Sequence, residues 1–240
     1  MLYSYLDQTG IALLLQGALR CFKPQQLDDP WLELPSDTAA SFESLLEQQY
    51  QQLPANMREL MDFNFFCQQA ESKRAQIEQQ LSQGDDQVQR PIIRLFEQPN
   101  NLQLWQRLAQ NHQGMVVGFE PVEQWPGAMA LKQVCYDRQR PKWPQQLFFQ
   151  PPEFSSDKEW RLQLAPQSAL SQKVEQQTLT TTQLPLTQID CLFFGYKMPS
   201  DVIRHIITSL ASQNIESLRL FRCKVQAGSY SIIPDKNLRL

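Results

Sequence analysis

Apolar residues occur only in short runs in this chain, and that feature limits what it can fold into. The longest run, Ile11–Leu15, has five residues, whereas a membrane-spanning helix needs roughly 18 or more. The first residues, Met1–Asp7, also lack the basic stretch and apolar core of a secretory signal. The pattern therefore predicts short strands and amphipathic helices, with no membrane partner.

Composition and charge narrow the class of protein further. The hydrophobic fraction is 42% and the formal net charge is −3, which is typical of a globular domain. Nucleic-acid binding is not expected, because it needs a dense cationic surface that displaces phosphate counterions. The five cysteines are widely spaced and form no C-x-x-C pair, so we expect no metal site and a reduced, cytoplasmic location.

The order of the segments predicts one α+β domain over residues 1–240. Strands are expected at Met1–Leu6, Ala18–Phe22, Pro91–Glu97, Met115–Phe119, Leu131–Tyr136, Lys158–Leu164, Thr178–Leu184 and Ile189–Phe194, with a terminal hairpin of Ser217–Val225 and Tyr230–Ile233. Helices are expected at Gln8–Leu15, Asn100–His112 and Asp201–Ser212. The expected fold is a mixed, mostly antiparallel sheet with surrounding helices.

A helical pair is expected to interrupt the strands at about residues 36–84. Ser36 and Asp37 can cap a helix that runs to Leu53, where Pro54 stops it. A second helix is expected from Asn56 to Leu81, before Gly84. No linker composition marks these helices as a separate domain.

The segment Glu159-Trp160-Arg161 offers the most specific chemistry. On a strand, alternation places Glu159 and Arg161 on one face and Trp160 on the core face. One interpretation is a surface ion pair of about 0.2–1 kcal/mol. The other is a carboxylate kept ionised by a guanidinium, which can stabilise an oxocarbenium-like centre.

Other candidate site residues each have a structural alternative. His112 ends the expected helix Asn100–His112, where it either interacts with the helix dipole or acts as a general base. Trp105 is either a core residue or a stacking surface for a ring. Asp29, before Pro30, is either a turn residue or a ligand-binding acid.

Several short motifs occur in an order that resembles domain-of-unknown-function family 2971, a bacterial family. The motifs are Leu2-Tyr3-Ser4-Tyr5, Asp28-Asp29-Pro30, the set Trp105, Ala109, His112 and Gly114, the pair Val134 and Tyr136, Asp157-Lys158-Glu159-Trp160-Arg161, and Ile189–Gly195. The resemblance spans nearly the whole chain outside the inserted helices. The chain departs from the family pattern at Leu6, or at Ser4 on another alignment, and at Lys23, Pro24, Gln150 and Phe154.

The chemistry expected of Glu159 beside Arg161, together with the order of the strands, suggests a remote analogy with ADP-ribosyltransferases. Those enzymes combine a basic residue, a hydroxyl residue and a late-strand glutamate, and only the glutamate is evident here, as Glu159. On this hypothesis Glu159, Arg161 and His112 are catalytic, and Tyr3, Tyr5, Asp29 and Trp105 bind a nucleotide or NAD in a transferase. The family resemblance further implies a defence or toxin–antitoxin setting. The alternative is a non-catalytic module whose inserted helices, with Phe63, Phe65 and Phe66, bind a protein partner.

Overall fold

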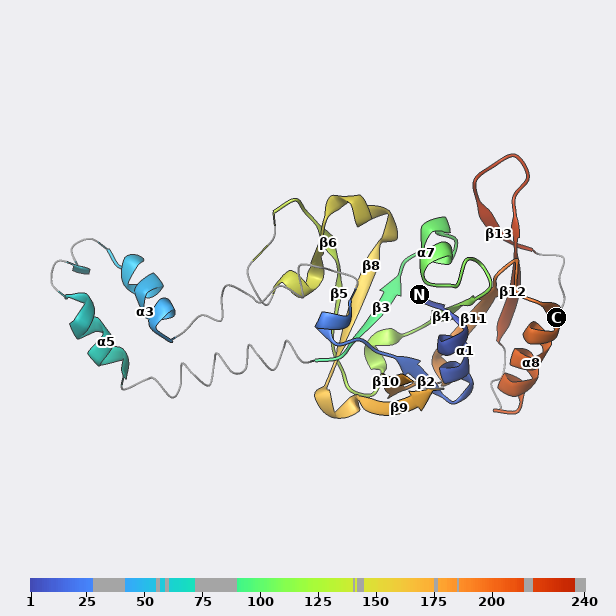
Figure 1. Ribbon diagram of the computed structural model, residues 1–240, viewed down its shortest axis with the longest axis horizontal. Coiled ribbons are helices and arrows are strands. Elements are labelled where there is room, and N and C mark those ends of the chain that lie inside the picture. Colours follow the sequence, from blue (N-terminus) through green and yellow to red (C-terminus); the bar gives the residue numbers. More distant parts are fainter. Residues whose placement is uncertain are drawn as a thin grey trace.

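The protein has the expected α+β fold, built on a mixed and mostly antiparallel sheet (Figure 1). The computed structural model describes residues 1–27, 42–54, 57–58, 61–71, 90–139, 141, 145–174, 177–184, 186–213 and 218–235. Within these ranges, no helix is long and apolar enough to cross a membrane.

The central sheet has eight strands in the order β13-β12-β11-β4-β1-β3-β8-β5. They are β1 (Leu2–Leu6), β3 (Ile92–Phe96), β4 (Met115–Phe119), β5 (Ala128–Gln133), β8 (Glu159–Leu164), β11 (Ile189–Phe194), β12 (Arg219–Val225) and β13 (Ile232–Asp235). Only β11 and β12 pair in parallel among these strands. The hairpin of β12 and β13, predicted from the turn at Gly228, is confirmed.

Two smaller sheets and several short helices complete the fold. One sheet joins β2 (Ala18–Arg20), β10 (Gln177–Gln183) and β9 (Leu170–Val174), and the other joins β6 (Cys135–Tyr136) and β7 (Phe149–Gln150). The α-helices of the main body are α1 (Gln8–Leu15), α7 (Leu102–Arg107) and α8 (Ser200–Ala211). The 3-10 helices are η1 (Pro24–Gln26), η2 (Val122–Gln124), η3 (Gln145–Phe148), η4 (Pro152–Asp157), η5 (Pro166–Ser168) and η6 (Leu186–Gln188).

The middle strands of the central sheet, such as β3, β4 and β11, are buried on both faces. One face, with Leu95, Val117 and Leu192, packs in a core with residues of α1 and α8. The other face, with Tyr5, Phe96, Val116 and Phe193, packs against Leu104 and Trp105 of α7. Side chains alternate between the faces at every residue of a strand, so burial on both sides explains why these strands read as nearly continuous apolar runs.

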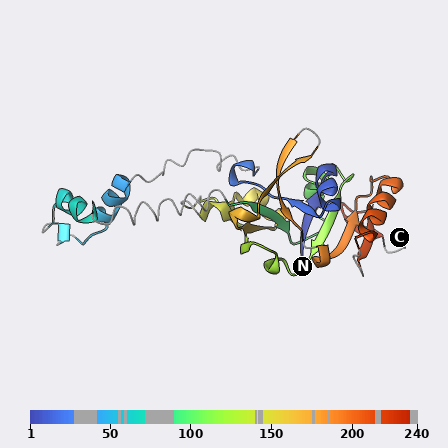
Figure 2. The same cartoon turned by 90° about the horizontal axis from the view of Figure 1, so that it is seen from below.

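The inserted helical pair is present as α3 (Phe42–Gln51) and α5 (Phe63–Glu71). The two helices contact each other through Tyr50, whose ring lies 5.3 Å from that of Phe63 and whose hydroxyl donates to the Met61 carbonyl at 2.9 Å. Figure 2 shows the same pairing from below. The predicted start of the second helix at Asn56 is wrong, because Met61 and Asp62 are not helical and α5 begins at Phe63. Residues 36–41, 56, 59–60 and 72–84 of the predicted pair lie outside the described residues.

The predicted helix Asn100–His112 is wrong at its end, because α7 stops at Arg107. Gln110, Asn111 and His112 all have positive φ angles, from 48° to 68°, and this left-handed backbone turns the chain from α7 into β4. Gly195 makes the turn possible, since a Cβ there would lie 2.1 Å from the His112 carbonyl oxygen. Strand β9, which the sequence analysis missed, is mostly polar and lies at the edge of its sheet.

Candidate functional site

A buried cluster of charges lies where β3 and β8 pair. The register sets Arg94 opposite Arg161 and Phe96 opposite Glu159, so Arg94, Arg161 and Glu159 share one face of the sheet. Arg94 donates from Nε and Nη2 to the two oxygens of Glu159, at 3.0 and 2.8 Å. Arg161 donates from Nε to Oε1 of the same carboxylate at 2.8 Å. The Glu159 carboxylate therefore forms ion pairs with both the Arg94 and the Arg161 guanidinium groups.

This cluster is shielded from water. Glu159 and Arg161 are fully buried and the Arg94 side chain is 10% exposed, which excludes the alternative of a surface ion pair. Burial alone would raise the pKa of the Glu159 carboxyl, but Arg94 and Arg161 outweigh burial and lower that pKa to about 2. The Glu159 carboxyl group is consequently ionised at neutral pH and fixes the positions of both arginines.

Residues of β6 and η3, between β5 and β8, hydrogen-bond to the cluster. Arg161 Nη1 donates to the Leu147 carbonyl at 2.5 Å, and the Glu159 amide donates to the Tyr136 hydroxyl at 2.8 Å. Burial, and to a smaller degree the nearby carboxylates of Glu159 and Asp157, raises the pKa of Tyr136 to about 12. The phenol therefore stays neutral and holds the start of β8 in place.

A cavity of about 260 Å³ opens beside this cluster. Strand β1 pairs with β4 from Leu2 to Leu6 but with β3 only at Tyr3↔Phe96, so β1 and β3 separate after that point. The far end of β3 is bridged by Phe22, opposite Ile92. The cavity fills the split, and its lining comprises Ser4, Tyr5, Leu6, Asp7, Gly10, Leu19, Arg20, Phe22, Gln26, Arg94, Phe96, Arg107 and Leu108.

Three arginines from three different elements line this cavity. Arg94 comes from β3 and is held by Glu159. Arg107 comes from α7 and binds the buried carboxylate of Asp157 at 2.5 Å. Arg20 comes from β2, stacks over the Phe22 ring at 4.8 Å, and makes no ion pair with any described residue. Two of the three guanidiniums are thus paired with carboxylates, and Arg20 supplies a positive charge that no described carboxylate pairs.

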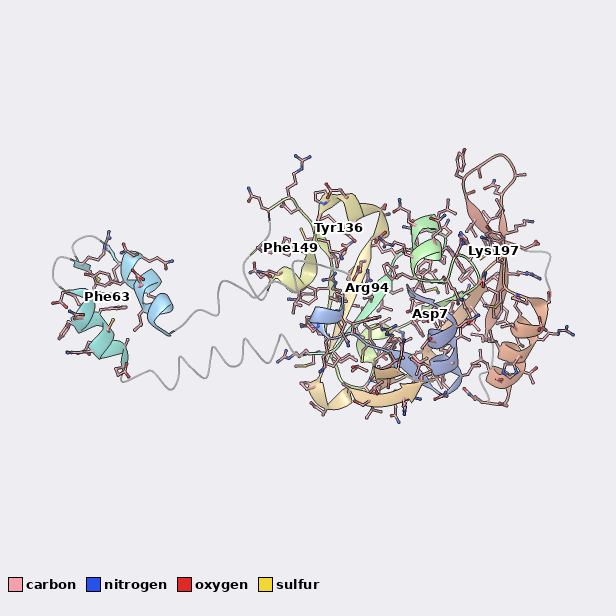
Figure 3. The ribbon with its side chains drawn as sticks, in the orientation of Figure 1. Asp7, Phe63, Arg94, Tyr136, Phe149 and Lys197 are labelled. Atoms are coloured by element: carbon pink, nitrogen blue, oxygen red, sulfur yellow. The ribbon has the colours of Figure 1, made fainter. Side chains whose placement is uncertain are left out.

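Asp7 supplies the carboxylate of the cavity. It lies between β1 and α1, and Figure 3 labels it together with Arg94, which enters from β3. Its Oδ1 accepts from the Gly10 amide at 2.7 Å and caps the first turn of α1. This cap orients the Asp7 side chain at the cavity wall.

The predicted site residues are divided between the cavity and the core. Tyr5 lines the cavity, and its hydroxyl donates to the Gln98 carbonyl at 2.6 Å. Trp105 is fully buried and packs edge-on against Tyr5, as a core residue does. Tyr3 is half-buried against Phe193 and does not line the cavity. Asp29 lies outside the described residues.

His112 lies apart from the cavity lining. Its ring is 4% exposed, between Trp105 and Tyr196 at centroid distances of 6.0 and 4.9 Å, and its Nδ1 has no hydrogen-bond partner among the described residues. Burial and, secondarily, the charge of Lys197 lower the pKa of this imidazole. The structure thus brings Glu159 and Arg161 together but does not add His112 to them.

The sequence analysis did not identify the three arginines that line the cavity. Arg94 gave a usable signal, because it is the one charge within the apolar run Ile92–Phe96 and a charge on a buried strand needs a partner. Arg20 and Arg107 gave none, since each reads as an ordinary polar residue at the end of its element. Only the split between β1 and β3 brings them together.

No protein-family model, curated protein or solved structure matches this chain. Among the described residues, no three His, Cys, Asp or Glu side chains are grouped in a way that could hold a metal ion.

Proposed function

We propose that this protein binds a small phosphate-bearing ligand of the nucleotide class in the cavity between β1 and β3. The observation that carries the proposal is the convergence of Arg20, Arg94 and Arg107 on one cavity. A guanidinium matches a phosphate group with two parallel hydrogen bonds, so arginines are preferred where phosphate is recognised.

The buried cluster supports binding because it holds part of the site in place before the ligand arrives. Arg94 makes two hydrogen bonds to Glu159, which is itself fixed by Arg161. A guanidinium fixed in this way loses little freedom when a ligand binds, and a preorganised site binds more tightly for that reason. In this proposal Glu159 and Arg161 are positioning residues.

The size of the cavity limits the ligand. Its volume of about 260 Å³ is just below the range of about 300–1,000 Å³ that is usual for drug-sized ligands. A mononucleotide or a smaller phosphate ester suits this volume better than a whole dinucleotide. If NAD is the ligand, one phosphate-bearing half occupies the cavity and the other half lies outside.

A group-transfer reaction at Glu159 stays a prediction from the analogy with ADP-ribosyltransferases. Both carboxylate oxygens of Glu159 already accept from arginines, and Arg94, not Glu159, lines the cavity. The geometry therefore supports binding better than it supports a Glu159-centred transferase. Membership of the bacterial family 2971 and a cytoplasmic location belong to the same proposal.

Titration calorimetry with AMP, inorganic phosphate and adenosine tests the proposal. AMP and phosphate should bind, adenosine should bind far more weakly, and Arg20→Gln should weaken AMP binding by about tenfold or more, because a hydrogen bond to a charged group contributes about 1.5–3 kcal/mol. Arg204→Gln, on the exposed face of α8, is the matched control and should bind as the wild type does. Equal affinity of the Arg20 and Arg204 variants would refute the proposal.

The exposure of Phe65 on α5 favours the second candidate function, docking of a protein partner on the inserted helices. Its side chain is 49% exposed, and Phe63 and Met57 nearby are 37% and 49% exposed. Phe65→Ser should then abolish co-purification of a partner from the native host while the thermal midpoint stays within about 2 °C of the wild type. Capture that survives this substitution counts against the docking role.

A further inference from the structure

We infer that the ligand is a phosphorylated sugar, whose hydroxyl groups are recognised by Asp7. The inference rests on the proposed phosphate site and specifies what the rest of the cavity binds. It starts from a chemical contrast within the lining, where one carboxylate, that of Asp7, occurs together with three arginines.

The Asp7 carboxylate is fixed but only partly used. Oδ1 accepts from the Gly10 amide at 2.7 Å, and Oδ2 makes no hydrogen bond with any residue in the part of the chain that the structure describes. Because Asp7 begins α1 and both Asp7 and Gly10 line the cavity, the carboxylate cannot leave the wall without losing the cap. The cavity therefore presents a fixed, ionisable hydrogen-bond acceptor.

A carboxylate at this place selects against simple anions. It repels a bare phosphate and so weakens the attraction of the three guanidiniums for that ion. A hydroxyl group, in contrast, donates a charge-assisted hydrogen bond to a carboxylate, as the ribose hydroxyls do in dinucleotide-binding sites. A ligand that carries both a phosphate group and hydroxyl groups can therefore bind the arginines and Asp7 at the same time.

Ser4 adds a second polar group to the lining of the cavity. It lies three residues before Asp7 on β1, is 7% exposed, and lines the cavity. Its hydroxyl can donate or accept, so a hydroxylated ligand has a polar partner in addition to Asp7. Phe22 and Phe96 supply apolar surface for the carbon face of the ring.

Ribose 5-phosphate, 2-deoxyribose 5-phosphate and inorganic phosphate form the test set, measured by titration calorimetry on the full chain. The wild type should bind ribose 5-phosphate about tenfold or more tightly than phosphate, and the deoxy compound should lie between them. Asp7→Asn keeps the helix cap, because asparagine caps as well as aspartate, but removes the charge. It should reduce the ratio of the two affinities, ribose 5-phosphate to phosphate, to about threefold or less.

Asp62→Asn is the matched control, since Asp62 also caps a helix, by accepting from the Phe65 amide at 2.7 Å, and does not line the cavity. It should leave the ratio unchanged, and Asp7→Ser, another capping residue, should repeat the effect of Asp7→Asn. Phosphate binding with no preference for ribose 5-phosphate, or a preference that survives both Asp7 variants, overturns the sugar inference while the phosphate site stands. Binding of none of the three compounds overturns the proposed function itself.

Discussion

Replacing Glu159 by glutamine should destabilise the fold more than any other single loss of charge in the described structure. The substitution keeps the shape of the side chain but removes the negative charge that Arg94 and Arg161 share. Two guanidiniums, one of them fully buried, are then left beside a neutral amide. Removing one partner of a buried ion pair costs about 3–5 kcal/mol, because the remaining charge is desolvated without compensation.

The pKa of Glu159 gives a second estimate of the same magnitude. The arginines lower the pKa from the ordinary value of 4.5 to about 2, and each unit of pKa corresponds to about 1.4 kcal/mol. The ionised carboxylate therefore contributes about 3 kcal/mol to folding at neutral pH. For a chain of this length, a loss of about 3 kcal/mol lowers the thermal midpoint by roughly 6–12 °C.

Chemical denaturation of the wild type and of Glu159→Gln, repeated from pH 7 to pH 2, measures this contribution. Because the folded pKa is the lower one, the contribution is complete above pH 4.5 and is lost as the pH falls toward 2. The gap between the two proteins should narrow over that window. Glu123→Gln, at an exposed glutamate of η2, should change stability by less than about 0.5 kcal/mol. A gap below about 1 kcal/mol at pH 7, or one that does not narrow in acid, would refute the reasoning.

Three further predictions concern other parts of the fold. In a urea titration, Gly195→Ala should lower the free energy of unfolding by about 4 kcal/mol or more, because its Cβ would lie 2.1 Å from a backbone oxygen. Gly228→Ala should lower it by only about 1 kcal/mol, because Gly228 has open space around it although its φ is +77°. Burial lowers the pKa of His112 in the folded state, so the wild type should lose stability as the pH falls below 6.5, and His112→Gln should abolish that loss. His205→Gln, at the exposed second histidine, should keep the loss. Identical pH profiles for both variants would contradict the assignment. Tyr5→Phe should destabilise the protein by about 1–3 kcal/mol in thermal melts, because the Gln98 carbonyl oxygen loses the Tyr5 hydroxyl that donates to it at 2.6 Å. An unchanged thermal midpoint would show that this hydrogen bond contributes nothing to stability.

Much of the fold could be predicted because its strands are short and strongly patterned. Met115–Phe119 and Ile189–Phe194 are bounded by turn residues and buried on both faces, so their limits follow from hydrophobicity alone. The limits of α1 at Gln8–Leu15 are likewise confirmed. The end of α7 was missed because a run of non-glycine residues with positive φ has no reliable sequence signature.

The candidate site was only half predictable for a physical reason. Strand alternation placed Glu159 and Arg161 together without any knowledge of the neighbouring strand. Which strand lies beside β8 depends on the order of the whole sheet, and that order brings in Arg94 from 65 residues earlier in the chain. Arg20 and Arg107 meet Arg94 only because β1 and β3 separate, which local patterns do not encode.

A crystal structure of the protein with ribose 5-phosphate tests the central claim most directly. The account predicts the phosphate group within hydrogen-bond distance of Arg20, with Arg94 still bound to Glu159, in the split between β1 and β3. A phosphate located on another surface, or a cavity that stays empty at ligand concentrations that saturate binding in solution, would contradict it.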